Sequence, residues 1–149
     1  MKKTSLLIII FIFSVIAISC TIPAKNKSSN YYYTSKLLQK LNEDKKIEIK
    51  VLNMSYYKVK LLSSEEVGTV LNYLKSVSKG DFIKSSKTEI KPIYRLYISF
   101  KDETYVIDIF NKEDISVFPY DGNFQQDDIK MNSKYKCYNL YYLCKNIFN

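Results

Sequence analysis

The strongest constraint on the fold is the strand-like pattern of three neighbouring segments, residues 93–100, 104–110 and 115–120, two of which contain apolar residues spaced by two. Leu96, Ile98 and Phe100 are spaced by two in the first segment, and Ile107 and Ile109 repeat this spacing in the second. Alternate residues of a strand point to the same face of a sheet, so the three segments are predicted to be strands and the residues spaced by two to form a core face. Because only short polar stretches separate them, the three strands are predicted to form an antiparallel meander.

Two shorter alternating segments, 46–52 and 55–62, precede the meander and are predicted to form a β-hairpin. After the hairpin, Ser63 and Glu66 have the spacing of a capping box and stand just before apolar residues at helical spacing. A helix is therefore predicted over residues 64–78. The region that follows, up to the meander, has weak patterning, with a short strand expected around Phe82.

Helices are also predicted near both ends of this region. Leu37, Leu38 and Leu41 have helical spacing after Thr34, which predicts a short helix over 34–44 with Thr34 as N-cap.

At the other end, residues 121–132 are predicted to be a polar loop, and residues 133–148 a helix that closes the domain over the sheet. Strands and helices thus occur in blocks, which favours an α+β fold. The prediction is a mainly antiparallel sheet of about five strands, made of a hairpin and a three-stranded meander, packed with two or three helices.

The N-terminus has the pattern of a secretion signal. Lys2 and Lys3 precede residues 6–18, of which only Ser14 is polar, and this length suits a signal peptide rather than a membrane-spanning helix. The segment ends in Ala-Ile-Ser-Cys at residues 17–20, which resembles the lipobox of bacterial lipoprotein precursors. The resemblance implies cleavage before Cys20 and diacylglycerol on its sulfur. An uncleaved membrane anchor and secretion without lipid are the alternatives.

This pattern divides the chain into a signal peptide (1–19), a lipid anchor and tether (20–32) and a single α+β domain (33–149). Two acyl chains hold a protein stably on a bilayer, whereas one binds only marginally. The predicted location is therefore the extracytoplasmic face of the cell membrane, with the membrane as a partner through the lipid. Lys25 and Lys27 in the tether could contact anionic head groups or be solvated.

Composition excludes most enzyme classes. The chain has no His, which removes Ser-His-Asp, Cys-His and His-zinc chemistry. Its carboxylates often occur as neighbours, as at Asp127 and Asp128, and neighbouring side chains diverge, so these are predicted to be cap, turn and loop residues. We expect no enzymatic activity, no catalytic residue, no cofactor and no metal site.

The formal net charge is +8, which raises the question of nucleic acid. Arg95 is the single arginine, however, and the lysines are spread over the whole chain. Lysine lacks the planar fork used in bidentate recognition, and an exported protein does not meet nucleic acid. We expect no nucleic-acid partner, only a general attraction to anionic envelope polymers and lipids.

Cys137 and Cys144 form an even pair in an exported protein, so a disulfide between them is chemically possible. On one helix their Cα atoms would be about 10.5 Å apart, beyond the roughly 7 Å that a disulfide allows. A bridge requires the helix to begin after Cys137, for instance with Asn139 as N-cap. The alternative is two separate thiols, with Cys144 packed as a small hydrophobe.

The chain contains 14 tyrosines, an unusual number. Tyrosine combines apolar area with a polar tip and serves in faces that bind peptides or sugars. The candidate binding surface is formed by residues on and beside the meander: Tyr94, Tyr97, Tyr105 and Tyr120. The alternative is that the tyrosines cap the sheet edges and the rim of the core.

Residues 105–111, 115–122 and 138–144, with Phe-Pro-Tyr-Asp-Gly at 118–122 as the most recognisable part, resemble a family of small lipoproteins of low-GC Gram-positive bacteria. That family is known only as a domain of unknown function. The resemblance implies location and fold but no catalytic residue. The expected function is a non-enzymatic, membrane-anchored envelope module that binds a peptide, protein or glycan. The alternative is an accessory or structural subunit of a membrane complex.

Overall fold

The computed structural model describes residues 27, 29–44, 46–84, 90–121, 125–131 and 137–149. The helices are α2 (Tyr32–Glu43), α3 (Ser64–Ser76) and α4 (Leu140–Phe148), with a short 3₁₀ helix at Lys79–Asp81. The strands are β1 (Glu48–Asn53), β2 (Lys58–Leu61), β3 (Phe82–Ile83), β4 (Tyr94–Ser99), β5 (Thr104–Ile109), β6 (Asp114–Pro119) and β7 (Asp127–Lys130).

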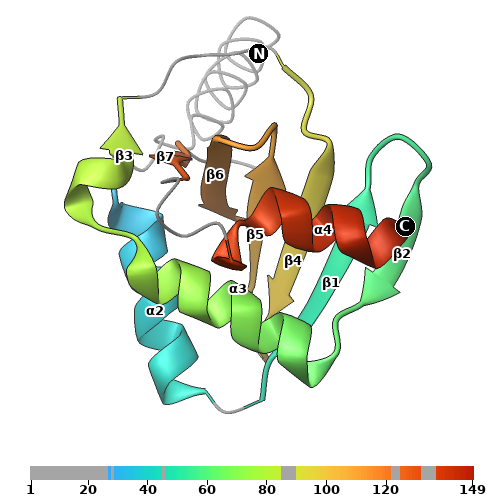
Figure 1. Ribbon diagram of the computed structural model, residues 1–149. Coiled ribbons are helices and arrows are strands. Elements are labelled where there is room, and N and C mark those ends of the chain that lie inside the picture. Colours follow the sequence, from blue (N-terminus) through green and yellow to red (C-terminus); the bar gives the residue numbers. More distant parts are fainter. Residues whose placement is uncertain (1–26, 28, 45, 85–89, 122–124, 132–136) are drawn as a thin grey trace, which may run out of the picture.

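The seven strands form one sheet in the order β2-β1-β4-β5-β6-β7-β3, and all neighbouring strands are antiparallel. Helices α2, α3 and α4 lie on the same face of this sheet (Figure 1). This is the predicted α+β class. No helix within the described part of the chain has the length and hydrophobicity needed to cross a membrane.

The core lies between the sheet and the helices. Leu96 pairs with Ile107 and Ile98 pairs with Tyr105 across β4 and β5, so these alternate residues share one face. They are buried in one cluster with Leu74 of α3 and with residues of α2 and α4. The meander is thus confirmed, and burial alternates along β4, whereas the residues of β5 and β6 are buried on both faces of the sheet.

The predicted hairpin is also confirmed, since β1 pairs with β2. Its second strand begins at Lys58, three residues later than predicted, because a turn occupies the intervening residues. The side-chain Oδ1 of Asn53 accepts hydrogen bonds from the backbone N–H groups of Ser55 (3.0 Å) and Tyr56 (3.3 Å) and closes this turn. Tyr57 completes it with a φ of 53°.

The sheet has seven strands rather than about five. The predicted short strand around Phe82 is β3, but β7 lies inside the segment that was predicted to be a loop, 121–132. The sequence of β7 begins with Asp127 and Asp128, and both are buried. Two adjacent carboxylates give no apolar alternation, so the pattern could not indicate this strand.

Two predicted helix starts are wrong. Helix α4 begins at Leu140 rather than at residue 133, because Asn139 caps it by accepting hydrogen bonds from the N–H groups of Tyr141 (3.0 Å) and Tyr142 (3.4 Å). Helix α2 begins at Tyr32, so Thr34 lies inside its first turn rather than at the N-cap.

The capping box of α3 is confirmed. The Ser63 hydroxyl accepts from the Glu66 N–H (3.4 Å), and the Ser63 N–H donates to the Glu66 carboxylate (2.6 Å). Replacing Ser63 with Ala should lower the free energy of unfolding by about 1 kcal/mol, since an N-cap hydroxyl is typically worth that much. Urea unfolding monitored by circular dichroism measures this loss. The matched control is Ser64→Ala at the next, exposed position, and an equal loss there would contradict the capping role.

Candidate functional site

The sheet face opposite the helices, which we call the outer face, carries the strand residues that alternate with the core residues. Cross-strand pairing places Arg95, Asp108, Ser116 and Asp128 in one row across β4, β5, β6 and β7. Residues directly opposite one another in neighbouring strands share a face and interact. The outer face therefore has a continuous polar row across its centre.

At one end of the row, Arg95 and Asp108 form a bidentate ion pair. Arg95 Nε lies 2.6 Å from Asp108 Oδ1, and Arg95 Nη2 lies 2.8 Å from Asp108 Oδ2. The hydrogen bond with Asp108 raises the pKa of Arg95 above its usual range. Asp108 is thus buried with its charge compensated, as a buried carboxylate requires.

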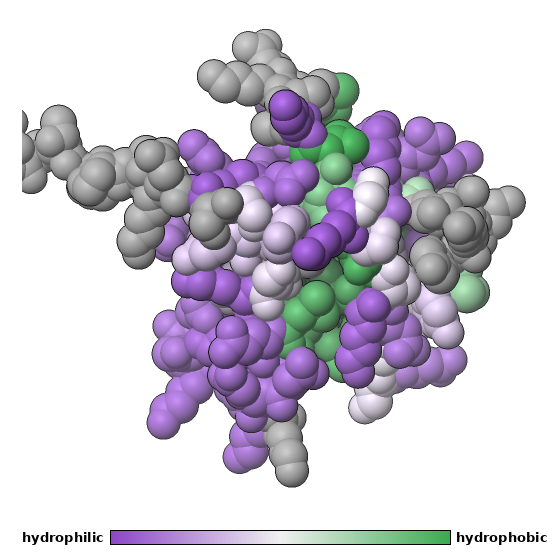
Figure 2. Space-filling model, turned by 90° about the vertical axis from the view of Figure 1, so that its left-hand side faces the viewer, coloured by the Kyte–Doolittle hydropathy of each residue, from purple (hydrophilic) through white to green (hydrophobic). Residues whose placement is uncertain are grey.

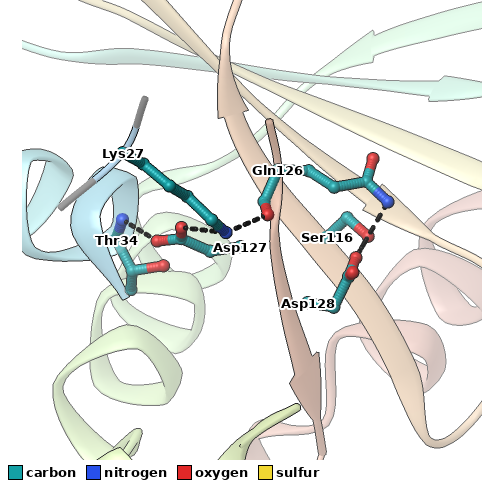
Figure 3. A network of polar contacts seen from close by, with 6 residues as sticks. All are labelled: Lys27, Thr34, Ser116, Gln126, Asp127 and Asp128. Carbon is teal, nitrogen blue, oxygen red and sulfur yellow. Dashed lines mark hydrogen bonds and ion pairs between the residues drawn. The ribbon is translucent and has the colours of Figure 1, made fainter. Parts of the chain in front are cut away.

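At the other end of the row, Asp128 has donors on only one oxygen. Its Oδ1 accepts from the Ser116 hydroxyl (2.5 Å) and from Gln126 Nε2 (2.9 Å), as Figure 3 shows. Its Oδ2 is buried and has no hydrogen-bond partner. Asp128 forms no salt bridge with any basic residue in the described parts of the chain.

Asp127 points the opposite way from Asp128, toward α2 (Figure 3). Its Oδ2 accepts from the Thr34 N–H in the first turn of α2 (2.7 Å), and Lys27 Nζ lies 3.3 Å from its Oδ1. Lys27 Nζ also donates to the Gln126 carbonyl (2.5 Å). Lys27 is therefore neither solvated in a linker nor free for lipid head groups, because it is paired with a buried carboxylate.

A cavity of about 320 Å³ lies on the outer face beside β6 and β7. Asp114, Ser116 and Asp128 line it, together with the apolar side chains of Ile83 and Ile90. Ile90 is 56% exposed. Figure 2 looks at the side of the molecule on which β3 lies, where a narrow band of hydrophobic residues reaches the surface between hydrophilic ones. The sequence did not point to this cavity, because its residues fall on strands and loops without a recognisable motif.

The four candidate tyrosines do not form one surface. Tyr94 and Tyr105 are buried in the core, and the Tyr94 ring stacks on that of Phe148 in α4 with a centroid distance of 6.0 Å. These two were wrongly expected at a binding surface, because their strand positions face the helices. Tyr97 and Tyr120 do meet, with ring centroids 5.7 Å apart in an edge-to-face arrangement, and Tyr120 is exposed.

An exposed apolar group lies near the Tyr97–Tyr120 pair, at the β2 end of the sheet. Val59 is 57% exposed and Leu61 is 61% exposed. Val59 pairs with Leu52 of β1, and Leu61 pairs with Lys50, which in turn pairs with Tyr97. We call the set of these apolar residues, Leu52, Val59, Leu61, Tyr97 and Tyr120, the edge patch. Lys50 lies between Leu61 and Tyr97 on this face. Singly exposed apolar residues are common, and a group of them at the end of a sheet is a candidate interaction site.

A family model described as "Domain of unknown function (DUF4883)" matches residues 27–144. The chain belongs to this family. The DUF4883 match begins at Lys27, the residue paired with Asp127, and takes in all seven strands.

Among solved structures, this DUF4883 protein is similar to one titled "Putative Lipoprotein from Clostridium perfringens". The two chains are 28% identical, with a TM-score of 0.75, over 83% of this chain and 98% of that chain. A search of curated proteins gave no match. The expected resemblance to a lipoprotein family of unknown function thus agrees with the family model and with the name of the solved structure.

The two cysteines of the DUF4883 domain lie in different surroundings. Cys137 is exposed, Cys144 is buried in α4, and both are free thiols in the structure, which corresponds to the alternative of separate thiols. Cys20 lies outside the described residues. The parts of the chain that are described contain no group of three or more acidic or cysteine side chains that could hold a metal ion.

Burial raises the pKa of the Cys144 thiol well above its usual range. Since the thiolate is the reactive form, a thiol reagent should modify Cys137 of the folded protein and reach Cys144 only after unfolding. Labelling in a Cys20→Ser background, followed by peptide mass spectrometry, measures this, with Cys137→Ser as the control. Failure of Cys137 to react before reduction would instead indicate the disulfide.

Burial raises the pKa of Asp127 from its usual value of 3.8, although Thr34 and Lys27 act to lower it. The folded protein then holds the proton more tightly than the unfolded chain, so Asp127 contributes less stability as the pH rises above 3.8. The quantity to measure is the unfolding free energy of the wild type minus that of Asp127→Asn. This difference should fall as the pH rises above 3.8.

The control is Asp102→Asn. Because the hydrogen bond from Lys40 lowers the pKa of Asp102, the unfolding free energy of the wild type minus that of Asp102→Asn should not fall as the pH rises. Urea unfolding of the three proteins at a series of pH values measures both differences. A difference for Asp127 that rises with pH would mean that the pairing with Lys27 outweighs the cost of burial.

Proposed function

We propose that this protein is anchored by lipid on Cys20 at the extracytoplasmic face of the cell membrane, where it acts as a non-enzymatic binding module. Its partner is an extended segment of another envelope protein, which pairs with β2 and covers the edge patch. The observation that carries this proposal is the exposure of Val59 and Leu61 on a strand at the end of the sheet.

The backbone of an end strand supports such binding. β2 pairs with β1 on one side and is the last strand of the described sheet on the other. The backbone groups on the open side can add a further strand, and alternate side chains then give specificity. Val59 and Leu61 would contact apolar residues of the added segment.

The charge around β2 favours an acidic partner segment. Lys58 is exposed at the start of the strand. Lys60 is already engaged, because its Nζ donates to the Ile147 carbonyl and lies 5.4 Å from the centroid of the Phe148 ring. Lys58 is therefore the basic residue of β2 that a carboxylate on the partner would meet.

The edge patch favours a polypeptide over a glycan. An edge-to-face tyrosine pair such as Tyr97 and Tyr120 could stack on a sugar. The aliphatic residues Leu52, Val59 and Leu61, however, form the larger part of the patch, and a protein segment matches them better. The alternative function, an accessory or structural subunit of a membrane complex, would use the same patch in a permanent contact.

The anchor rests on the sequence at Cys20 and on the similarity to a solved protein whose title calls it a lipoprotein. Diacylation would hold the domain stably on the membrane. Replacing Cys20 with Ser should remove the mass of the lipid from the intact protein and shift the protein out of the membrane fraction.

The binding proposal is tested by photo-crosslinking of the full-length protein in the bacterium that produces it. A benzophenone side chain at position 61 or 120 should give the same discrete protein adduct, whereas one at position 75, exposed on α3, should not. Crosslinked peptides identified by mass spectrometry should come from one acidic and apolar segment of the partner.

The variant Val59→Lys places a charge on an exposed residue of β2. It should reduce the adduct from the probe at position 120 at least fivefold. Equal adducts from positions 75 and 120, or none from either patch position, would contradict the proposal. An adduct with a glycan would support sugar binding instead, and one with an integral membrane protein that resists dissociation would support the subunit role.

A further inference from the structure

We infer that the cavity between β3, β6 and β7 binds a small organic cation, with a primary ammonium group on Asp128 and a short apolar body against the isoleucines. This site is separate from the edge patch, and the inference does not depend on partner binding at β2. It rests on the cavity, on the Asp128 carboxylate in its wall, which has no cationic partner among the described residues, and on the apolar side chains around that carboxylate.

The cavity has the size of a small-ligand site. Its volume of about 320 Å³ lies at the lower end of the range of roughly 300–1,000 Å³ for ligand pockets. Ligand pockets are mostly apolar with a few placed polar groups. Here Ile83, Ile90, Phe110 and Ile115 supply the apolar walls, and Asp128 lies among them.

The other carboxylate in the cavity wall is fully compensated. One oxygen of Asp114 lies 2.6 Å from Lys130 Nζ, and the other accepts from Asn111 Nδ2 (2.9 Å). Although burial acts to raise it, these two contacts hold the pKa of Asp114 below its usual value. A ligand cation would therefore gain little from Asp114.

Asp128 lacks such compensation. It is only 7% exposed, its Oδ1 has two neutral donors, and its Oδ2 has none. Arg95, the arginine of the same row, forms a bidentate ion pair with Asp108. A buried carboxylate without a cationic partner is costly, and a positively charged ligand would remove that cost.

The surroundings favour an ammonium group over a metal ion. A metal needs several charged or carbonyl oxygens, and the described residues hold no group of three or more suitable side chains. A single carboxylate flanked by the neutral donors of Ser116 and Gln126 suits one N–H donor. The apolar walls require that the rest of the ligand be aliphatic.

The experiment compares three matched probes, butylammonium, butanol and butyrate, on the detergent-solubilised full-length protein. Binding is followed by amide chemical shifts in NMR spectra. Butylammonium should bind with shifts centred on Ile83, Ser116 and Asp128, and butanol and butyrate should bind at least tenfold more weakly. This comparison uses only the wild type and so does not depend on the folding of any variant.

The variant Asp128→Asn keeps the shape of the side chain and removes its charge, so its affinity for butylammonium should fall at least tenfold. Asp102→Asn, an equal loss of charge at an exposed position, should leave that affinity unchanged. Equal binding of butanol and butylammonium, equal affinity of the wild type and Asp128→Asn, or no saturable binding at millimolar concentration would each overturn the inference. These outcomes test only the cavity, and the crosslinking from positions 61 and 120 tests the proposed function separately.

Discussion

The rest of the structure depends on one constraint: in the described part of the chain, three helices cover a single face of a seven-stranded sheet. On the covered face, burial of apolar side chains is the main source of stability, and the core of β1, β4, β5 and β6 is made of such residues. On the outer face the strands bury polar groups against one another, beside the buried apolar residues Val106 and Phe118. Arg95 with Asp108 and Ser116 with Asp128 do so, and each pair is formed across neighbouring strands. The two kinds of candidate site both follow from this asymmetry, since neither could exist on the helical face.

Much of the fold could be predicted from the residues that face the core. Leu96, Ile98 and Ile107 alternate because one face of their strands packs against the helices. Ser63 and Glu66 have the spacing of a capping box and stand just before an apolar run. The strand β7 could not be predicted in this way. Asp127 and Asp128 are buried against residues that are distant in the sequence, such as Thr34 and Ser116. A local sequence pattern does not indicate such partners.

The candidate site was predicted less well than the fold. Tyr94 stands two residues before Leu96, and Tyr105 two before Ile107, so alternation places both tyrosines on the core face, where they lie in the structure. The prediction of a binding surface did not apply this spacing to the tyrosines. Tyr97 and Tyr120 lie together because the chain turns back between β5 and β6. The cavity depends on the placement of β3 and β7 at the end of the sheet, so only the three-dimensional arrangement could indicate Asp128.

The contact between Lys27 and Asp127 has a consequence for how the domain is held at a membrane. With a lipid on Cys20, as proposed, the seven residue steps to Lys27 can extend at most about 25 Å, so the β7 end of the sheet is kept near the bilayer. β2 lies five strand spacings from β7, about 24 Å across the sheet. The β7 end of the sheet would then be proximal to the membrane and the β2 end distal. The unpaired edge of β2 would therefore lie at the end that can extend away from the lipid surface.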